Sequence, residues 1–360
     1  MDVAHVEDAK DARLHVRFGG KNLKYLSICF VDHNNMADKK QLIIGELETM
    51  RQGDVIRGEK FSALAYLKVI KHLQTLPAIY TIADCEGTKG MGAKIKAKIE
   101  EILETGVLAA ATRTRTELKM DVYDQLLKVH GVGPVKAREL VTEGVTSIAD
   151  LRTKTRLLND VQVMGLKYYE DILERIPREE MLAHEKWLKA ALPAECQGEI
   201  VGSFRRQAAT SGDIDMLITL PDIDVKPAAQ KKVFHLYIEK LRKSGYIKDI
   251  LALGDKKCMA VVKLGEGQKA RRLDLLLTPF SEYAYAVLYF TGSDTFNVAF
   301  RRHATELGYT LNEHILKPLA AGVATVPFMP DEGAIFEFLR LKYVEPAARL
   351  GEKSVSKISD

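Results

Sequence analysis

The sequence predicts an α+β protein, with helices in its first half and most of its strands in its second half. From Gln41 to about Ala111, apolar residues recur at mixed spacings of three and four, the period of an amphipathic helix. A Gly-x-Gly string flanked by helical stretches occurs twice, at 90–92 and 131–133. After residue 200, short apolar runs follow glycine turns, which favours strands.

Composition bounds the class of protein. A chain of 360 residues can hold two or three domains that each bury a core. Its hydrophobic content of 46% and charged content of 28% are ordinary for a globular protein. No apolar run approaches the roughly 20 residues that span a bilayer. The cysteines lack CxxC spacing, which argues against a disulfide framework or a zinc site and for a reducing compartment. They are Cys29, Cys85, Cys196 and Cys258.

Residues 1–40 are predicted to be an N-terminal extension, in which 23–31 is a candidate strand. The first eleven residues carry four acids, which argues against a mitochondrial presequence and a secretory signal. From Met36 the sequence reads as a polar start that leads into an amphipathic helix. We therefore take Met36 as a hypothetical alternative start, which mass spectrometry of a native protein beginning at Met1 would contradict.

The two Gly-x-Gly strings lie forty-one residues apart and share their hydrophobic flanks. Gly90 and Gly92, and again Gly131 and Gly133, free backbone amides at a helix N-terminus, where they can meet a DNA phosphate. The pattern predicts two helix-hairpin-helix elements, which grip the DNA backbone without reading sequence. The alternative is a pair of helical hairpins formed by packing alone.

A lysine cluster follows the first string. Lys94 and Lys98 are four residues apart and share a helix face, with Lys89 and Lys96 nearby. Closely spaced cations favour a neutral amine, which can attack an aldehyde and form a Schiff base. A cationic face that holds phosphate is the alternative, and these residues alone favour it.

The stretch 200–220 combines two chemical features. Gly202 and Ser203 precede a short helical piece, and they offer backbone N–H groups and a hydroxyl to a phosphate. Asp213 and Asp215 are two apart in a predicted strand, so their carboxylates share a face and repel unless a cation lies between them. Oxygen ligands of this kind select a hard divalent ion such as Mg²⁺. Together with Arg206, they indicate phosphoryl or nucleotidyl transfer. The alternative is a polar edge strand beside a glycine-rich hairpin.

Two regions flank this stretch. A proline-containing turn at 175–180 predicts a boundary and a helix over 179–192. Residues 226–272 hold ten Lys and three Arg against four acids, which favours a polyanion such as nucleic acid. A solvated helix-and-hairpin surface would explain the same charge.

A third acid lies in the β-rich run 271–277. Asp274 is flanked by leucines, and an Asp on an apolar strand is costly unless it has a partner. A metal held by Asp213 and Asp215 would be that partner. Three carboxylates on neighbouring strands predict a two-metal site, in which one ion activates a hydroxyl and the other neutralises leaving phosphates.

The last segment with chemical character is 288–297. Tyr289 and Phe290 stand beside Gly292, and a predicted helix with Asp294 and Asn297 follows, so the segment could floor a nucleotide pocket. Otherwise it would be an ordinary strand–turn–helix element of a core.

The strings GSFRR, SGDIDML, RRLDL, LYFTGSDTFN and RIPREEM, with both hairpins, closely resemble the family X DNA polymerases over residues 41–346. The resemblance implies a helical lyase domain, then thumb-, palm- and finger-like subdomains, with a nucleotidyltransferase-type palm sheet and a C-terminal α+β subdomain. The implied boundaries are 41–112 for the lyase domain, 113–173 for a DNA-binding subdomain with the second hairpin, 174–283 for the palm and 284–360 for nucleotide selection.

The resemblance also implies residue roles. Asp213 and Asp215 would bind two Mg²⁺ ions, for which Mn²⁺ can substitute, and Asp274 would bind the catalytic ion and help deprotonate the primer 3′-hydroxyl. Tyr289 and Phe290 would exclude a ribose 2′-hydroxyl, and Lys98 would be the Schiff-base lysine of a deoxyribose-phosphate lyase. The residues implied to hold the nucleotide are Ser203, Arg206, Ser211, Gly212, Tyr289, Phe290, Gly292, Asp294 and Asn297. Those implied to contact DNA are Gly90, Gly92, Lys94, Gly131, Gly133, Lys257, Arg272 and Arg301.

The implied partners are gapped or nicked double-stranded DNA and deoxynucleoside triphosphates, with no membrane partner. A monomer in the nucleus is expected, while a mitochondrial or viral setting stays open. The resemblance further implies a monovalent cation at the hairpin turns.

The chain departs from the family pattern at four positions. Ala97 stands where an acid usually neighbours the lyase lysine, and Gly58 and Ala63 align with a His and a Tyr that assist it, so we expect weak lyase activity. Leu276 replaces an arginine linked to open–closed switching, so that switch is not implied.

Two other functions stay open: a template-independent terminal transferase of the same fold, and a non-catalytic DNA-binding protein. Templated gap filling is favoured by Arg301, by the two hairpins and by the lack of an obvious long insertion near Tyr289 and Phe290. The three acids argue against a protein that only binds DNA.

Overall fold

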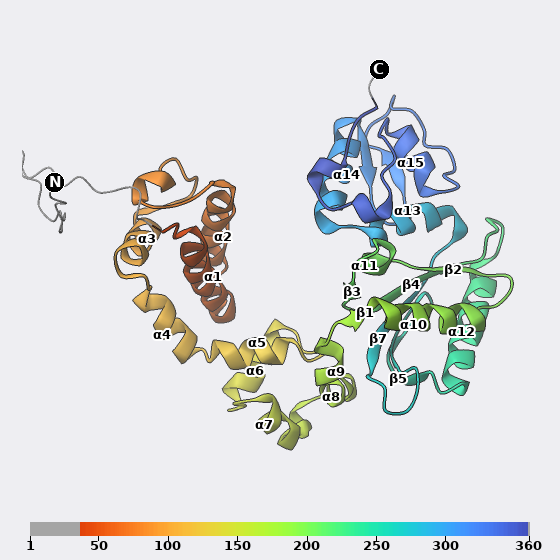
Figure 1. Cartoon of the computed structure of the whole chain (residues 1–360), viewed down its shortest axis with the longest axis horizontal. Helices are drawn as coiled ribbons and strands as arrows, with labels where there is room; N and C mark the ends of the chain where they lie inside the picture. The colour runs from red at the N-terminus through yellow and green to blue at the C-terminus, as the bar shows by residue number, and fades with distance from the viewer. Residues whose placement is uncertain (1–36, 359–360) are drawn as a thin grey trace, which may run out of the picture. The chain divides into compact units, whose positions relative to one another are not determined.

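A computed structural model describes residues 37–358, which form two compact units that divide between Thr112 and Arg113 (Figure 1). The candidate strand at 23–31 and the hypothetical start at Met36 lie outside the described residues. Within the described part, none of the helices combines the length and the apolar character needed to cross a membrane.

The first unit is helical, as the periodicity of 41–111 predicts. Its core consists of apolar residues on facing helices, such as Leu47, Val69 and Ile99, which are fully buried. The helix that continues into the second unit contains the division point. The elements are α1 (Lys40–Arg57), α2 (Lys60–Thr75), η2 (Ile82–Cys85), α3 (Ala93–Thr105) and α4 (Ala109–Glu117).

Both predicted hairpins form. Gly90 and Gly131 adopt φ values of 87° and 83°, in the left-handed region that favours glycine, and each turn leads directly into a helix. The first turn precedes α3 and the second joins two short helices of the second unit. The helices of this region are α5 (Met120–Leu127), α6 (Pro134–Thr142), α7 (Ile148–Thr153), η3 (Thr155–Leu157), α8 (Asp160–Lys167) and α9 (Tyr169–Leu173).

A five-stranded mixed sheet forms the centre of the second unit, with strand order β2-β4-β7-β6-β5. The central strands β4 and β7 run parallel, and the other neighbours are antiparallel. The strands are β2 (Gln197–Ile200), β4 (Ile214–Thr219), β5 (Ile247–Leu253), β6 (Lys257–Val262) and β7 (Arg271–Leu277).

Two helices, α10 (Arg178–Ala191) and α12 (Pro227–Lys243), cover one face of this sheet (Figure 1). Ile214, Met216 and Leu273 point into the core beneath them. Because side chains alternate along a strand, Asp215 and Asp274 point to the opposite face. The sheet therefore separates the basic helix α12 from the acids.

Short elements connect the sheet to its surroundings. The strand β1 (Ile176–Pro177) precedes α10 and pairs with β3 (Thr210–Ser211), which lies between β2 and β4 in sequence, and α11 (Gly202–Arg205) follows β2. The C-terminal part contains α13 (Phe280–Thr291), α14 (Asp294–Glu306), β8 (Tyr309–Leu311), β9 (Leu316–Pro318), α15 (Glu332–Phe338), η4 (Pro346–Ala348) and η5 (Glu352–Ser354).

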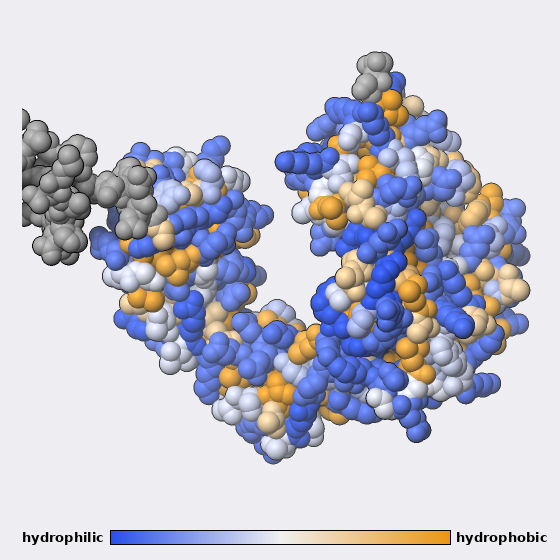
Figure 2. All heavy atoms as spheres, in the orientation of Figure 1, coloured by the Kyte–Doolittle hydropathy of each residue, from blue (hydrophilic) through white to orange (hydrophobic). Residues whose placement is uncertain are grey.

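The strand–turn–helix alternative for the segment around 288–297 is wrong, because residues 280–291 form helix α13. Ala284, Leu288 and Thr291 recur at spacings of four and three and are all buried. On a helix this spacing places them on one face, where Ala284 and Leu288 pack against the core that contains Phe296 and Phe300. The segment is therefore a helix–turn–helix. Figure 2 shows that hydrophilic residues predominate on the visible face of the molecule, with hydrophobic residues scattered among them.

Candidate active site

The site begins with two acids on the central strands. Asp215 of β4 and Asp274 of β7 are direct register partners across the parallel pair, on the sheet face opposite α10 and α12. Asp274 is only 6% exposed. Burial raises the pKa of Asp215 to about 6, and the charge of Asp274 adds to this effect. Two carboxylates held this close favour a cation between them.

The other predicted acid, Asp213, does not lie on the strand as expected. β4 begins at Ile214, so Asp213 precedes the strand and the alternation argument holds only for Asp215. The Asp213 carboxylate forms an ion pair with Arg272, whose Nε lies 3.6 Å from Asp274 Oδ1. Within residues 37–358, no group of three or more His, Cys, Asp or Glu side chains is arranged to hold a metal.

Asp215 and Asp274 nevertheless fit a divalent cation. Asp274 Oδ1 is buried without a hydrogen-bond partner among residues 37–358, and this carboxylate forms ion pairs with Lys257, at 3.3 Å from Oδ2, and with Arg272. Carboxylate oxygens with free lone pairs are the ligands that Mg²⁺ and similar ions prefer. Asp213 would join the pair once Arg272 releases it.

The predicted phosphate cradle lies directly beside this pair. Gly202 has a φ of 66°, and a Cβ at this position would stand 3.5 Å from Asp215 Oδ2. The Val201 N–H donates to the Asp215 carbonyl at 2.9 Å. Ser203 Oγ donates to Ser211 Oγ at 3.1 Å, which brings two predicted nucleotide contacts together. Gly212 adjoins the Arg175 guanidinium.

Arg206 connects the cradle to the C-terminal part. Its Nη1 donates to the Thr291 carbonyl at 2.5 Å, and a Cβ on Gly292 would lie 3.2 Å from the same atom. Burial lowers the pKa of Arg206, and the charge of Asp294 opposes this shift. The structure thus brings Arg206, Gly292 and Asp294 together, as a shared nucleotide site requires.

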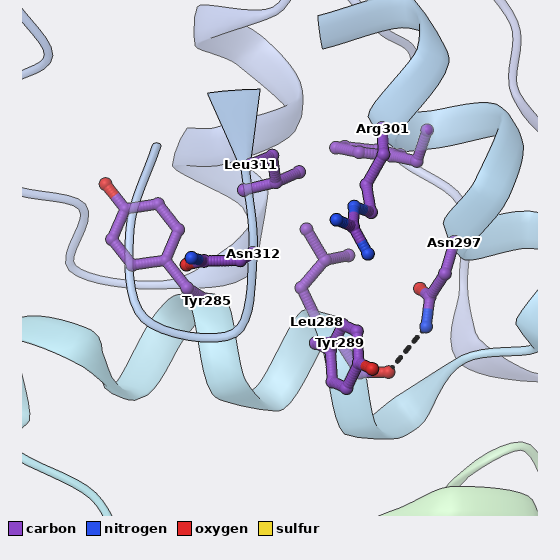
Figure 3. Close-up of a pocket in the computed structure, with 8 residues that line it drawn as sticks. Tyr285, Leu288, Tyr289, Asn297, Arg301, Leu311 and Asn312 are labelled. Atoms are coloured by element: carbon purple, nitrogen blue, oxygen red, sulfur yellow. Dashed lines mark hydrogen bonds between the residues drawn. The ribbon is translucent and has the colours of Figure 1, made fainter. Parts of the chain in front are cut away.

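Two of the remaining predicted nucleotide contacts, Tyr289 and Asn297, line a small cavity formed by α13, α14 and the end of β8 (Figure 3). Asn297 Nδ2 donates to the Tyr289 carbonyl at 2.7 Å, and the Arg301 guanidinium points toward both residues. The cavity volume of about 10 Å³ holds no more than one water, so a nucleotide would lie over this surface and not inside it. Phe290 packs edge-to-face on Tyr289, with ring centroids 5.2 Å apart.

A buried ion network supports this arrangement, and sequence reasoning missed it. Glu332 of α15 receives two hydrogen bonds from Arg349, both 2.9 Å, and two from Arg205 of α11, at 2.9 and 3.2 Å. Arg349 is completely buried, and its carbonyl accepts from Ser293 N at 3.3 Å. The first arginine of the GSFRR string, Arg205, was the chemical signal in the sequence, while nothing near Glu332 pointed to its role.

In the first unit, the lysines of the first hairpin lie on one helix face, as predicted. Lys98 Nζ lies 3.5 Å from the Lys94 carbonyl oxygen, and Lys98 is partly exposed on α3. Gly58 caps α1 in the left-handed conformation and Ala63 is buried, so neither position supplies a proton-transferring group. Lys98 therefore stands without the supporting residues that the family pattern would place there.

The acid pair leads to a prediction about stability. At pH 7.5 in EDTA, Asp215→Asn should raise the free energy of unfolding by roughly 1–3 kcal/mol, because the raised pKa of Asp215 means that its charged form is disfavoured in the folded state. The stabilisation from a raised pKa is present below the ordinary value of 3.8 and is lost as the pH rises through about 6. Thermal unfolding in EDTA and in Mg²⁺ measures it: Mg²⁺ should stabilise the wild type but not the variant.

The exposed Asp224, replaced by Asn, is the matched control and should leave both melting temperatures unchanged. A lower melting temperature of Asp215→Asn in EDTA would show that the folded state does not disfavour the charged form of Asp215.

Models of known protein families match three successive segments of the chain. Residues 124–173 match the fingers domain of DNA polymerase lambda, 175–280 match the DNA polymerase beta palm, and 286–350 match the DNA polymerase beta thumb. The names run in the reverse of the thumb–palm–finger order expected above: the second hairpin lies in the fingers and the nucleotide-selection residues lie in the thumb.

Comparison with individual proteins gives DNA polymerases and a DNA nucleotidylexotransferase as relatives. DNA polymerase lambda from Rattus norvegicus is 32% identical over 341 residues, covering 89% of this chain and 58% of the relative. DNA polymerase lambda from Arabidopsis thaliana is 27% identical and is also covered to 58%, with 81% of this chain aligned. DNA nucleotidylexotransferase from Gallus gallus is 29% identical, with 84% of this chain and 66% of the relative aligned. The chain thus spans about three-fifths of the length of the polymerase lambda relatives.

The three family models match consecutive segments: the first contains the second hairpin, the second contains the cradle and the acid pair, and the third contains the turn at Gly292. Because fingers, palm and thumb models of these polymerases all match this one chain, and a DNA polymerase lambda aligns with most of it, the chain belongs to the family X DNA polymerases.

Proposed function

We propose that this chain is a DNA-directed DNA polymerase that fills short gaps in base-excision repair by metal-assisted nucleotidyl transfer. The observation that carries the proposal is the in-register pair Asp215 and Asp274 beside the Gly202 cradle. The relatives named as DNA polymerases support it.

In this mechanism, divalent cations supply charge neutralisation at the phosphates and activation of the primer 3′-hydroxyl. Asp215 and Asp274 would hold the cations, joined by Asp213, and the unpartnered Asp274 Oδ1 would accept the hydroxyl proton. Lys257 and Arg272 flank Asp274 and would contact the primer backbone.

The nucleotide is held from the other side. Ser203 and Arg206 would bind the triphosphate, and Asp294 and Asn297 would orient the incoming nucleotide over the surface in Figure 3. The Tyr289 and Phe290 side chains would exclude a 2′-hydroxyl at the sugar. We propose two Mg²⁺ ions per active site, with Mn²⁺ as a substitute, and a monovalent cation at each hairpin turn.

The direct test is incorporation of one nucleotide into a one-nucleotide gap with Mg²⁺. We expect extension that depends on the templating base and stops when the gap is filled. Addition without a template would instead favour terminal transfer, the activity named for the relative from Gallus gallus. Absence of any incorporation, with DNA still bound, would contradict both catalytic functions.

The proposal includes a second activity, a deoxyribose-phosphate lyase that uses Lys98. Lys98→Ala should eliminate borohydride trapping on a 5′-deoxyribose phosphate, because the trapped adduct requires the Nζ amine, while gap filling stays within about twofold. Trapping that persists in the variant would assign the Schiff base to another amine. The exposed Lys71 of α2, replaced by Ala, is the control for charge loss in the same unit.

We further propose that the protein acts as a monomer in the nucleus, on gapped or nicked DNA and without a membrane partner. Light scattering of the purified protein and fluorescence microscopy of a tagged chain test these two points. A dimer, or a signal confined to mitochondria, would contradict them.

A further inference from the structure

A buried arginine stands at the first position of the catalytic strand. Arg271 begins β7 and is only 3% exposed. Since side chains alternate along the strand, Arg271 faces α10, while Arg272 and Asp274 face the active site. A buried guanidinium is costly unless its donors are satisfied, so its partners reveal what it connects.

Arg271 joins three elements. Its Nε and Nη2 donate to the two carboxylate oxygens of Glu180 on α10, at 2.6 and 2.8 Å. Its Nη1 donates to the backbone carbonyls of Glu174 and Asp171 at the end of α9, at 2.8 and 3.3 Å. This fork-to-fork pair is geometrically specific, because the planar guanidinium matches the carboxylate at two points. Burial lowers the pKa of the neighbouring His184 to about 4, so His184 stays neutral. The charge of Glu180 is therefore paired with Arg271 and not with His184.

The end of α9 also contacts the two residues that precede β7. Ala270 N donates to Asp171 Oδ2 at 2.7 Å, and Lys269 forms an ion pair with Glu174. Three consecutive residues, Lys269 and Ala270 before β7 and Arg271 as its first residue, therefore bind the same short segment. Their attachment fixes where the following residue, Arg272, can reach.

The helix α8, which directly precedes α9 in the chain, packs against the second hairpin. Gln162 of α8 donates from Nε2 to the Gly131 carbonyl at 2.9 Å. A Cβ at Gly165 would overlap the His130 carbonyl oxygen, so only glycine lets the hairpin turn approach α8 this closely. Hairpin, α8, α9 and β7 thus form one continuous chain of contacts.

From these contacts we propose that Arg271 is a positioning residue that fixes the distance between the hairpin's grip on the DNA backbone and the acid pair of the catalytic strand. The inference rests on the proposed polymerase function. With Arg271 in place, a primer held at the hairpin presents its 3′-hydroxyl to Asp274 in one register. Without it, the start of β7 loses its attachment to α9 and α10, and Arg272 and Asp274 shift relative to the bound primer.

Single-turnover gap filling separates positioning from folding, because misfolded enzyme lowers the amplitude while misplaced groups lower the rate constant. Arg271→Met should lower the rate constant at least roughly tenfold, since displacements of about 1 Å at reacting groups carry losses of this size or more. The amplitude, the affinity for gapped DNA and the nucleotide concentration for half-maximal rate should stay within about twofold. Arg271→Lys, which keeps the charge without the fork, should recover part of the rate.

The matched control is Arg51→Met in the first unit. Arg51 forms the same two-point contact with Glu48, at 2.7 and 2.5 Å, but on a partly exposed helix face. Its loss should leave the single-turnover rate constant unchanged.

Glu180→Gln removes the charge of the partner while keeping its shape, and the double variant with Arg271→Met should be no slower than Arg271→Met alone. A reduced amplitude with an unchanged rate constant, in Arg271→Met or in Glu180→Gln if the former does not fold, would overturn the inference. Failure of the wild type to fill the gap would instead contradict the proposed function, so the two failures are distinguishable.

Discussion

Asp274→Ala is expected to lower nucleotide incorporation at least about a thousandfold, because loss of a cation ligand removes several kcal/mol of transition-state stabilisation. Asp274 is the most buried acid of the site, and its Oδ1 accepts no hydrogen bond from residues 37–358. Single-turnover gap filling with saturating Mg²⁺ and nucleotide measures the loss.

DNA binding provides the necessary contrast. Removal of one negative charge beside Lys257 and Arg272 should leave the affinity for gapped DNA equal or slightly higher, because backbone contacts dominate it. Asp224→Ala, at an exposed acid of the same subdomain, should retain full activity. If synthesis survives in Asp274→Ala, the assignment of Asp274 as a cation ligand is wrong.

Glu332→Ala is expected to destabilise the second unit by about 3–5 kcal/mol, because it leaves the fully buried Arg349 without a carboxylate. The half-buried Arg205 would also lose this partner and keep only its ion pair with Glu199. For a unit of this size, such a loss corresponds to a melting temperature lower by roughly 10 °C or more. Arg349 also lies over the rings of Phe296 and Phe336, so its displacement would disturb the core around the nucleotide turn. Thermal unfolding of the whole chain measures the change.

The exposed pair of Glu352 and Arg302, 3.1 Å apart, supplies the control, and Glu352→Ala should cost less than about 1 kcal/mol. The pH dependence gives a second check. Burial raises the pKa of Glu332, but Arg349 and Arg205 outweigh it, so the pKa lies below its ordinary value of 4.5. This stabilisation is present above 4.5 and is lost as the pH falls through the lower folded-state pKa. The wild type should therefore lose stability more steeply than Glu332→Ala in acid; parallel curves would show that the network does not hold Glu332 ionised.

Much of the architecture follows from local patterns in the sequence. The helical period of 41–111, both Gly-x-Gly hairpins, the helix near 179–192 and the strand 271–277 all form where predicted. Each depends on residues within a few positions of one another, such as the glycines that adopt left-handed turns at Gly90 and Gly131. The positions of Asp215 and Asp274 follow from the same local rules, because alternation on a strand sets which face each acid occupies.

Some sequence patterns fit more than one structure, and the residues packed against them decide which structure forms. The apolar run 280–291 fits a strand or a helix by content, and its packing against Phe296 and Phe300 makes it a helix. The basic block 226–272 suggested a polyanion surface, yet the sheet separates its helix α12 from the acids. Secondary structure in such cases depends on which neighbours bury the side chains.

The sequence by itself determined the fold class, the two Gly-x-Gly turns and the positions of Asp215 and Asp274 on their strands. The tertiary structure decided which charges meet: Arg272 with Asp213, Arg205 with Glu332 across 127 residues, and Arg271 with Glu180 across 91 residues. Local periodicity carries no information about pairs so far apart in the chain. Buried charges require partners, but which partner each obtains depends on the packing of whole subdomains.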